Sequence, residues 1–163
     1  MILSEIEKEI VNLNGEIKNL GTLLRKASQR ASELRDLRES MLMERFVDYI
    51  ELDSTFTFQS FMSFNGIQTG IKPTDTHFSP NFAAGDVIKF IKKNKKSIVI
   101  ICTSKTISQR ENGVIVKKVD NSYNKTFRVE ISSLYHNLLR NENFKRGFET
   151  YIKRKEALDS IGI

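Results

Sequence analysis

The sequence is poor in the residues that form disulfides, metal centres and catalytic triads. It has one cysteine and two histidines among 163 residues. A single cysteine excludes an internal disulfide, and Cys102 lies in the apolar run of residues 97–103, where we expect a buried thiol in a reducing compartment. Neither His77 nor His136 has a partner at the spacing of a metal site or triad. We therefore predict no metal, no cofactor and no catalytic residues.

Long apolar runs are also missing. No stretch approaches the roughly 18 uninterrupted apolar residues of a membrane-spanning helix. The first residues carry acids, such as Glu5 and Glu7, where a secretory signal would carry bases. The spacing of Gly66 and Gly70 lacks the Lys and Ser or Thr that complete a phosphate-binding loop. We expect a cytoplasmic protein without a membrane partner.

The first third of the chain contains a long heptad repeat. Apolar or small residues recur there at alternating spacings of three and four, which matches 3.5 residues per turn and specifies a narrow seam for another helix. Arg38 interrupts the stripe before Met41, so we expect the pairing to loosen or end there. We expect the seam to pair two copies of the chain, and its residues are Leu3, Ile6, Ile10, Leu13, Ile17, Leu20, Leu24, Ala27, Ala31 and Leu34.

One continuous helix to about residue 49 is the interpretation that we favour for this segment. Ser4 is a plausible N-cap, with Glu7 three residues later as in a capping box. Gly15 and Gly21 each cost about 1 kcal/mol relative to alanine, and a hairpin near the first of them is one alternative. The heptad phase passes through both glycines unchanged, which a turn of arbitrary length would not preserve. A monomer whose helix folds back on itself or on the rest of the chain is the other alternative.

The positive charge is concentrated in one segment. The chain has a net charge of +6, from 26 Lys and Arg against 20 Asp and Glu. Residues 1–45 are neutral, residues 46–84 carry −3, residues 85–131 carry +7 and the remainder carries +2. A surface for anionic partners is therefore expected within residues 85–131.

Strand-like patterns dominate the middle of the chain. Residues 55–58 alternate with period two and predict a strand, and an irregular connection with both prolines follows at 69–84. Four further strands are predicted at 86–92, 97–103, 113–119 and 125–131, with a lysine-rich turn after the first and a longer polar loop at 104–112. The second of these runs does not alternate, so we expect both of its faces to be covered, most simply by a helix.

The end of the chain predicts two helices. A shorter one begins at Ser132 and runs to Leu139. A longer amphipathic one presents Phe144, Phe148 and Tyr151 on one face, continued by Ile152 and Lys155.

Short motifs mark the strand-like segment. Gly85-Asp86 opens the first strand, Asn112-Gly113-Val114 begins a later one, and Phe127-Arg128-Val129 followed by Leu134 forms the last. With these motifs the segment resembles the small SH3-like barrels of the KOW and Tudor type. The loop at 104–112 departs from the compact KOW pattern. The resemblance covers about 50 residues, 85–134, and implies a barrel that contacts nucleic acid or a protein tail and has no catalytic role. In general style the chain is also similar to the small DNA-binding early proteins of large phages.

The patterns and the resemblance together predict an α+β protein. Residues 1–50 form a coiled-coil arm, and residues 51–163 form a small antiparallel SH3-like barrel covered by C-terminal helices.

The lysine-rich turn is the strongest candidate for a binding site. Ammonium groups on one tight turn repel each other unless an anion or water disperses their charge, so we predict that they contact nucleic-acid phosphates. Solvated lysines that protect a β edge from aggregation are the alternative. The candidate residues are Lys92, Lys93, Lys95 and Lys96 at the turn, with Lys89, Lys117, Lys118, Lys125 and Arg128 on the strands around it.

We therefore expect a non-enzymatic homodimer that binds nucleic acid, DNA in preference to RNA. The alternative is a protein-interaction module, an inhibitor or adaptor, whose lysines steer it to an acidic surface. An enzyme whose site is assembled from residues far apart in sequence is a third possibility.

Overall fold

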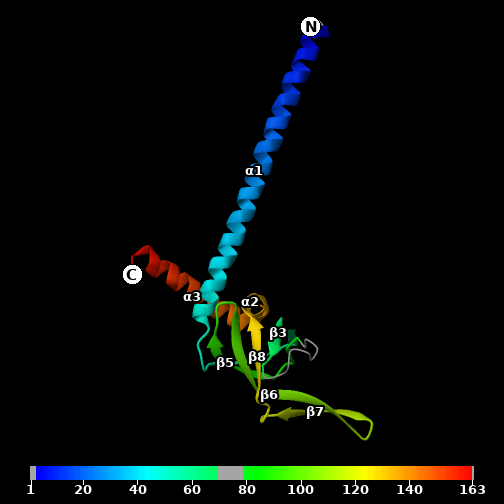
Figure 1. Ribbon diagram of the computed structural model, residues 1–163, viewed down its shortest axis with the longest axis vertical. Coiled ribbons are helices and arrows are strands. Elements are labelled where there is room, and N and C mark those ends of the chain that lie inside the picture. Colours follow the sequence, from blue (N-terminus) through cyan, green and yellow to red (C-terminus); the bar gives the residue numbers. More distant parts are fainter. Residues whose placement is uncertain (1–2, 70–78, 163) are drawn as a thin grey trace. The chain divides into compact units, whose positions relative to one another are not determined.

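The computed structural model describes residues 3–69 and 79–162 (Figure 1). The chain divides into two compact units, Met1–Leu42 and Met43–Ile163, each described by itself below. The boundary expected from the sequence was at residue 50. His77 and most of the predicted irregular connection at 69–84 lie outside the described residues.

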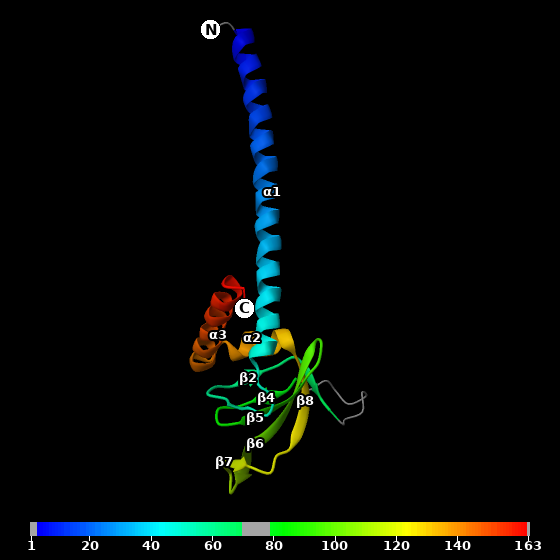
Figure 2. The ribbon, with the colours of Figure 1, turned by 90° about the vertical axis from the view of Figure 1, so that its left-hand side faces the viewer.

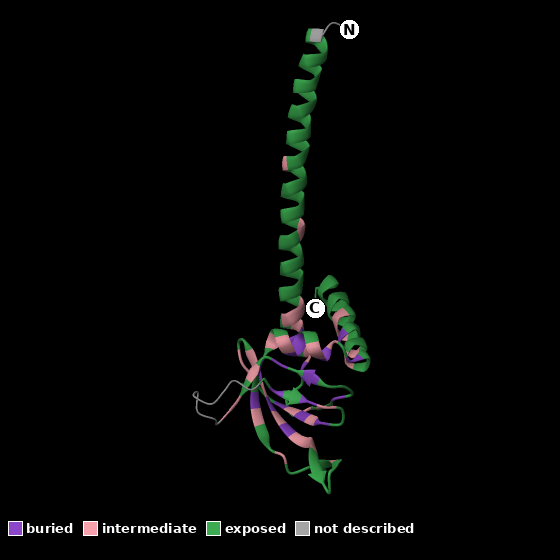
Figure 3. Ribbon diagram, turned by 90° about the vertical axis from the view of Figure 1, so that its right-hand side faces the viewer, coloured by how far each residue is buried: buried purple, intermediate pink, exposed green. Residues whose placement is uncertain are grey.

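The first unit consists of helix α1, which spans Leu3–Tyr49 and continues into the second unit. The prediction of one continuous helix is confirmed, because the segment around Gly15 is helical and leaves no place for a hairpin. From Ser4 to Met41 every side chain is exposed except two half-buried ones, as the colouring of Figure 3 shows. The apolar seam is part of this exposed surface: Leu24 is 74% exposed and Leu20 is 65% exposed.

The second unit is built on an antiparallel six-stranded sheet. Five strands lie in the order β1 (Thr55–Thr57), β5 (Val87–Lys93), β6 (Ser97–Glu111), β8 (Lys125–Glu130) and β3 (Gly66–Gln68). The sixth strand, β7 (Val114–Asp120), pairs with the second half of β6. A separate two-stranded sheet joins β2 (Met62–Ser63) to β4 (Asn81–Phe82). The larger sheet is open among the described residues, so the predicted barrel is not confirmed.

The prediction of a polar loop at 104–112 is wrong. Strand β6 continues through it to Glu111 and turns at Asn112-Gly113 into β7, so that the two strands form a hairpin beyond the rest of the sheet. Asn112 and Gly113 have φ values of 51° and 82°, the left-handed conformation of a tight hairpin turn. The alternation of a half-buried strand is absent here because neither face of this hairpin is fully buried.

The first half of β6 has one buried face and one half-buried face. Ile98, Ile100 and Cys102 are 0% exposed. Val99 and Ile101 point to the opposite face of the pleat and are half-buried. The expectation that both faces would be covered is therefore met on one side only.

Phenylalanines fill the space under the buried face. Phe58 and Phe82 stack with their ring centroids 4.9 Å apart, and Phe64 packs against both. All three are 1% exposed and therefore form part of the core. Phe61 is the exception, since it is 69% exposed.

Two C-terminal helices complete the second unit, as predicted. Helix α2 spans Ile131–Leu138, and α3 spans Glu142–Ser160 with Asn141 as its N-cap. Both lie beside the last turns of α1 (Figure 2). Phe46 from α1 is fully buried and contacts the rings of Tyr135, Phe144 and Phe148.

A buried ion pair fastens the start of β5 to the middle of β6. The carboxylate of Asp86 is fully buried and accepts hydrogen bonds from the backbone N–H of Ala83 and Thr106, at 2.8 and 2.7 Å, and from Lys105 Nζ at 2.7 Å. Lys105 Nζ also donates to the carbonyl of Asn81 and lies 4.9 Å from the ring centre of Phe82. Burial alone would raise the pKa of Asp86, but the hydrogen bonds and the charge of Lys105 outweigh it and leave the pKa below its ordinary value.

Replacing this carboxylate should therefore destabilise the second unit. We expect Asp86→Asn to lower the free energy of unfolding by about 2–4 kcal/mol, because it leaves the Lys105 ammonium without its counter-charge. A carboxylate whose pKa is lowered by folding stabilises the folded protein at pH values above the ordinary pKa of that carboxylate, which is 3.8 for Asp86. The wild-type protein should therefore lose stability as the pH falls below 3.8, and the variant should lose less. Urea unfolding at pH 7 and pH 3 measures both effects. The control is Asp53→Asn, which removes an exposed partner of Lys89 and should cost less than about 1 kcal/mol; equal losses in the two variants would contradict the role of Asp86.

Two glycines in helices should respond to alanine with opposite signs. A Cβ at Gly147 in α3 would lie 2.4 Å from the hydroxyl of Tyr49, whose ring is packed against three others. Gly147→Ala should therefore destabilise the second unit by about 1–2 kcal/mol despite its better helix propensity. Gly15→Ala meets no atom within 4 Å and should stabilise α1 by about 1 kcal/mol. Tyrosine fluorescence reports on the second unit and far-UV circular dichroism on the helices; stabilisation by Gly147→Ala would contradict the close contact.

Candidate nucleic-acid interface

The register of the sheet brings two of the predicted cationic residues into one row. Val99 on β6 lies opposite Lys92 on β5 and opposite Arg128 on β8. Opposite residues of antiparallel strands point to the same face, so Lys92 and Arg128 flank Val99 on the half-buried face of the sheet. Both cations are exposed, and two strand spacings place their backbones about 10 Å apart.

The turn between β5 and β6 adds two more cations at the end of this row. The backbone N–H of Asn94 donates to the carbonyl of Ser97 at 2.8 Å, which leaves Lys95 and Lys96 at the tip of a tight hairpin. Both lysines are exposed. We call Lys92, Lys95, Lys96 and Arg128 the sheet-face cluster.

Lys89 is on the same face but has a partner. It lies opposite Ile101, one row away from Val99, and its Nζ is 2.9 Å from Asp53 Oδ1. The main chain of Asp53 adopts a φ of 66° in the turn after α1, and its N–H donates to the carbonyl of Phe90. The turn after α1 thus supplies a counter-charge to Lys89.

The other four predicted residues lie elsewhere. Lys93 is half-buried and opposite Ile98, on the core side of the pleat, and Lys125 is opposite Cys102 with its Nζ 5.2 Å from the ring centre of Tyr123. Lys117 and Lys118 are on β7, which pairs only with the far half of β6, and Lys118 forms an ion pair with Glu111. The nine predicted residues therefore do not form one surface.

Charge on the sheet face is positive after its acids are counted. Glu130 is exposed on this face, opposite Ser97 and two residues from Arg128. The sheet-face cluster and Glu130 together give a net charge of +3. Val99 and Ile101 form an apolar floor beside the cations, so an approaching anion would meet less competing water there than on an open turn.

Aromatic stacking has little support on this unit. Phe127 is 7% exposed and belongs to the core. Tyr123 is half-buried and already carries the Lys125 ammonium over its ring. Contacts to phosphates therefore fit this surface better than contacts to bases.

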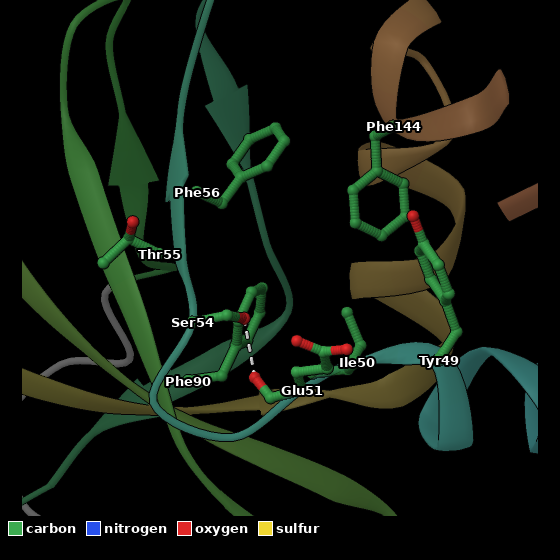
Figure 4. A pocket seen from close by; sticks show the side chains of 8 residues that line it. All are labelled: Tyr49, Ile50, Glu51, Ser54, Thr55, Phe56, Phe90 and Phe144. Carbon is green, nitrogen blue, oxygen red and sulfur yellow. Dashed lines mark hydrogen bonds between the residues drawn. The ribbon is translucent and has the colours of Figure 1, made fainter. Parts of the chain in front are cut away.

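A shallow pocket lies beside the end of α1, within the second unit (Figure 4). Its volume is about 280 Å³, and Figure 4 shows Phe56 on the strand side and Tyr49 and Phe144 on the helix side. The hydroxyl of Ser54 donates to the carbonyl of Glu51, and burial together with the charge of Glu51 raises the pKa of Tyr49. The lining residues offer no pair of nucleophile and base, and they are Tyr49, Ile50, Glu51, Ser54, Thr55, Phe56, Phe90 and Phe144.

Residues 3–69 and 79–162 contain no group of three or more His, Cys, Asp and Glu side chains that could hold a metal ion. Every helix in the same ranges is too short or too polar to cross a membrane. Comparisons with protein-family models, with curated proteins and with solved structures found no significant match to the chain.

Two features of this unit were missed by reasoning from sequence. Asn112-Gly113 is among the strongest short-range signals for a hairpin, and it could have revealed that the polar stretch before it is a strand. Lys105 was grouped with the inserted loop, whereas the structure pairs it with Asp86. No local signal could have shown this pairing, because the two residues are 19 positions apart.

The thiol of Cys102 should be protected in the native protein. It is fully buried and donates to the carbonyl of Ser104, and burial raises its pKa to about 11 despite the opposing charge of Lys105. At pH 8 only about one thiol in a thousand would be ionised. We expect no reaction with Ellman's reagent until denaturant unfolds the second unit; rapid labelling without denaturant would contradict this burial.

Proposed function

We propose that this protein is a non-enzymatic homodimer that binds nucleic acid, DNA in preference to RNA, through phosphate contacts. The sheet-face cluster holds the phosphates, and the exposed seam of α1 pairs two copies. The SH3-like resemblance of residues 85–134 belongs to the same proposal, since small barrels of that type contact nucleic acid or protein tails.

The observation that supports the phosphate contact best is the row formed by Lys92, Val99 and Arg128. Two cations held on neighbouring sides of one strand present a fixed charge spacing to a polyanion, while the turn lysines extend it. Arg128 can donate two hydrogen bonds to one phosphate, and the lysines act as point charges. Such contacts position a protein on nucleic acid without reading its sequence.

The observation that supports pairing is the exposure of the seam. Between Ile6 and Met41 its large apolar side chains are 40–74% exposed in the single chain. A second copy would remove this surface from water and would join two weak phosphate sites into one molecule.

The exposed hairpin favours a protein partner as the second candidate. Val114, Ile115 and Val119 are 64%, 69% and 59% exposed, and within residues 3–69 and 79–162 β7 pairs with β6 alone. A free strand edge with apolar side chains can extend the sheet of another protein. Such binding would persist in high salt, whereas phosphate binding would weaken.

The dependence of binding on salt tests the phosphate contact. We expect the logarithm of the affinity for duplex DNA to fall linearly with the logarithm of the salt concentration. Removing all four charges of the sheet-face cluster, with Lys92→Gln, Lys95→Gln, Lys96→Gln and Arg128→Gln, should flatten the slope by about 3–4 units for each copy that contacts the DNA. Fluorescence anisotropy at several salt concentrations measures the slope.

The matched control removes four exposed charges from α3, with Lys145→Gln, Arg146→Gln, Lys153→Gln and Arg154→Gln. Its net charge equals that of the test variant, so a local contact should leave its slope close to the wild-type value. An unchanged slope in the test variant, or equal flattening in both, would overturn the assignment to the sheet-face cluster.

A further inference from the structure

The exposed segment of α1 carries opposite net charges in its two halves. Residues 3–22 contain four acids and two bases, a net charge of −2, and residues 23–42 contain five bases and three acids, a net charge of +2. The helix dipole favours acids early and bases late, but it acts only within the first and last turns. Arg30 and Arg35 lie well before the end of α1 at Tyr49, so the dipole does not account for them.

The charges next to the seam follow the same division. The heptad positions that flank the seam hold Glu7, Glu9 and Glu16 in the first half and Arg30 and Arg35 in the second. In a parallel pair Arg30 would lie beside Arg35 of the second copy, and Arg38 would lie against Arg38. The remaining flanking positions would bring no acid beside a base. A parallel arrangement thus contains repulsions and no compensating attraction.

An antiparallel pair centred on Thr22 reverses this balance. Glu16 then lies beside Arg30 of the second copy and Glu7 beside Arg35, and each contact occurs twice by symmetry. Arg38, the one charged residue in the seam, lies opposite Ile6 and next to Glu7 instead of facing its own copy. Every like-charge contact of the parallel arrangement is removed.

The sizes of the seam residues agree with the same arrangement. The antiparallel order places Ala27 opposite Ile17 and Ala31 opposite Leu13. Each small residue faces a large one, which keeps the distance between the helices even along the seam. A parallel order would place alanine against alanine in two successive layers and would leave the larger residues to set a wider spacing elsewhere.

We propose that two copies of this chain pair through residues 3–41 as an antiparallel coiled coil. This inference rests on the proposed dimer and specifies its geometry. The paired segment is roughly 57 Å long at 1.5 Å per residue. Because the chains run in opposite directions, the second units are attached at opposite ends of the paired segment.

Disulfide trapping in the full chain tests the orientation. In a Cys102→Ser background, Ile10→Cys, Leu34→Cys and the combination of both are oxidised and analysed on a denaturing gel. The antiparallel order places position 10 of one copy against position 34 of the other, and it separates identical positions by roughly 36 Å. We expect a covalent dimer from the combined variant and none from either single variant.

The other outcomes would overturn the antiparallel pair. Covalent dimers from each single variant would establish a parallel pair. An internal disulfide in the combined variant without a dimer band would establish a helix folded back on itself. A monomer in analytical ultracentrifugation at high micromolar concentration would exclude pairing of either kind. The comparison of salt slopes between the sheet-face variant and the α3 variant does not depend on how the chains pair, so failure here and failure of the phosphate contact remain distinguishable.

Reversing the charge at position 30 is an independent test, because it should change the dimer affinity in opposite directions for an antiparallel and a parallel pair. Arg30→Glu should weaken an antiparallel dimer by roughly three- to tenfold, because it meets Glu16 of the second copy at two places, and adding Glu16→Arg should restore the affinity. In a parallel dimer Arg30→Glu would instead gain Arg35 as a partner and tighten the association. Arg25→Glu is the control for the altered charge, since position 25 points away from the seam. Arg30 also forms an ion pair with Glu33 of its own helix at 3.2 Å, and Glu16→Arg would not restore the loss of that pair. A dimer weakened by Arg30→Glu and not restored by Glu16→Arg would therefore overturn the pairing of Arg30 with Glu16.

Discussion

The buried ion pair of Asp86 and Lys105 is the constraint on which the second unit depends. Strand β6 pairs with three other strands, and Asp86 holds it at the point where it passes from the core sheet into the hairpin with β7. One carboxylate satisfies two backbone donors and one ammonium there, and the ammonium in turn reaches β4 through the carbonyl of Asn81. Hydrogen bonds to a charged group contribute more than neutral ones, so this one side chain fixes the relative positions of three strands.

Local sequence patterns were sufficient to predict most of the helices and strands, but the pairings between residues far apart in the sequence could not be predicted from them. The spacing of apolar residues was sufficient to predict α1, the strand at residues 55–58 and both C-terminal helices, because each of these segments keeps one regular period along its length. The second half of β6 was predicted as a loop because both of its faces remain largely in water and its side chains show no period of two, although its partner β7 was predicted as a strand. For a different reason, the sequence did not show which of the candidate cations lie together. Sequence shows how many cations a strand carries, but only the register shows which of them share a face and which have carboxylate neighbours.

The same division explains why the number of lysines is a poor guide to an anion-binding surface. Lys89 and Lys118 have acids close to them, and Lys125 lies over an aromatic ring, so three of the nine predicted cations have partners within the fold. An ammonium with a partner must give up that contact before it binds a phosphate, which reduces its net contribution. Cations without such a cost are the ones that determine affinity. Four of the other predicted cations, Lys92, Lys95, Lys96 and Arg128, lie at one end of the core sheet, around Val99 and the turn between β5 and β6, whereas Lys93 and Lys117 lie elsewhere.

The geometry of the proposed dimer decides what two such surfaces can do together. A weak phosphate site gains affinity from a second one only when both can bind at once, and the gain depends on the distance between them. Sites carried at the same end of a parallel pair would compete for neighbouring phosphates of one short segment. The proposed paired segment, at roughly 57 Å, is as long as about 16 base pairs of duplex at 3.4 Å per step. The proposed dimer, with one unit attached at each end, is suited to joining two stretches of nucleic acid. The charges along α1 would then set the orientation of the two chains, and the charges on the sheet would bind the phosphates.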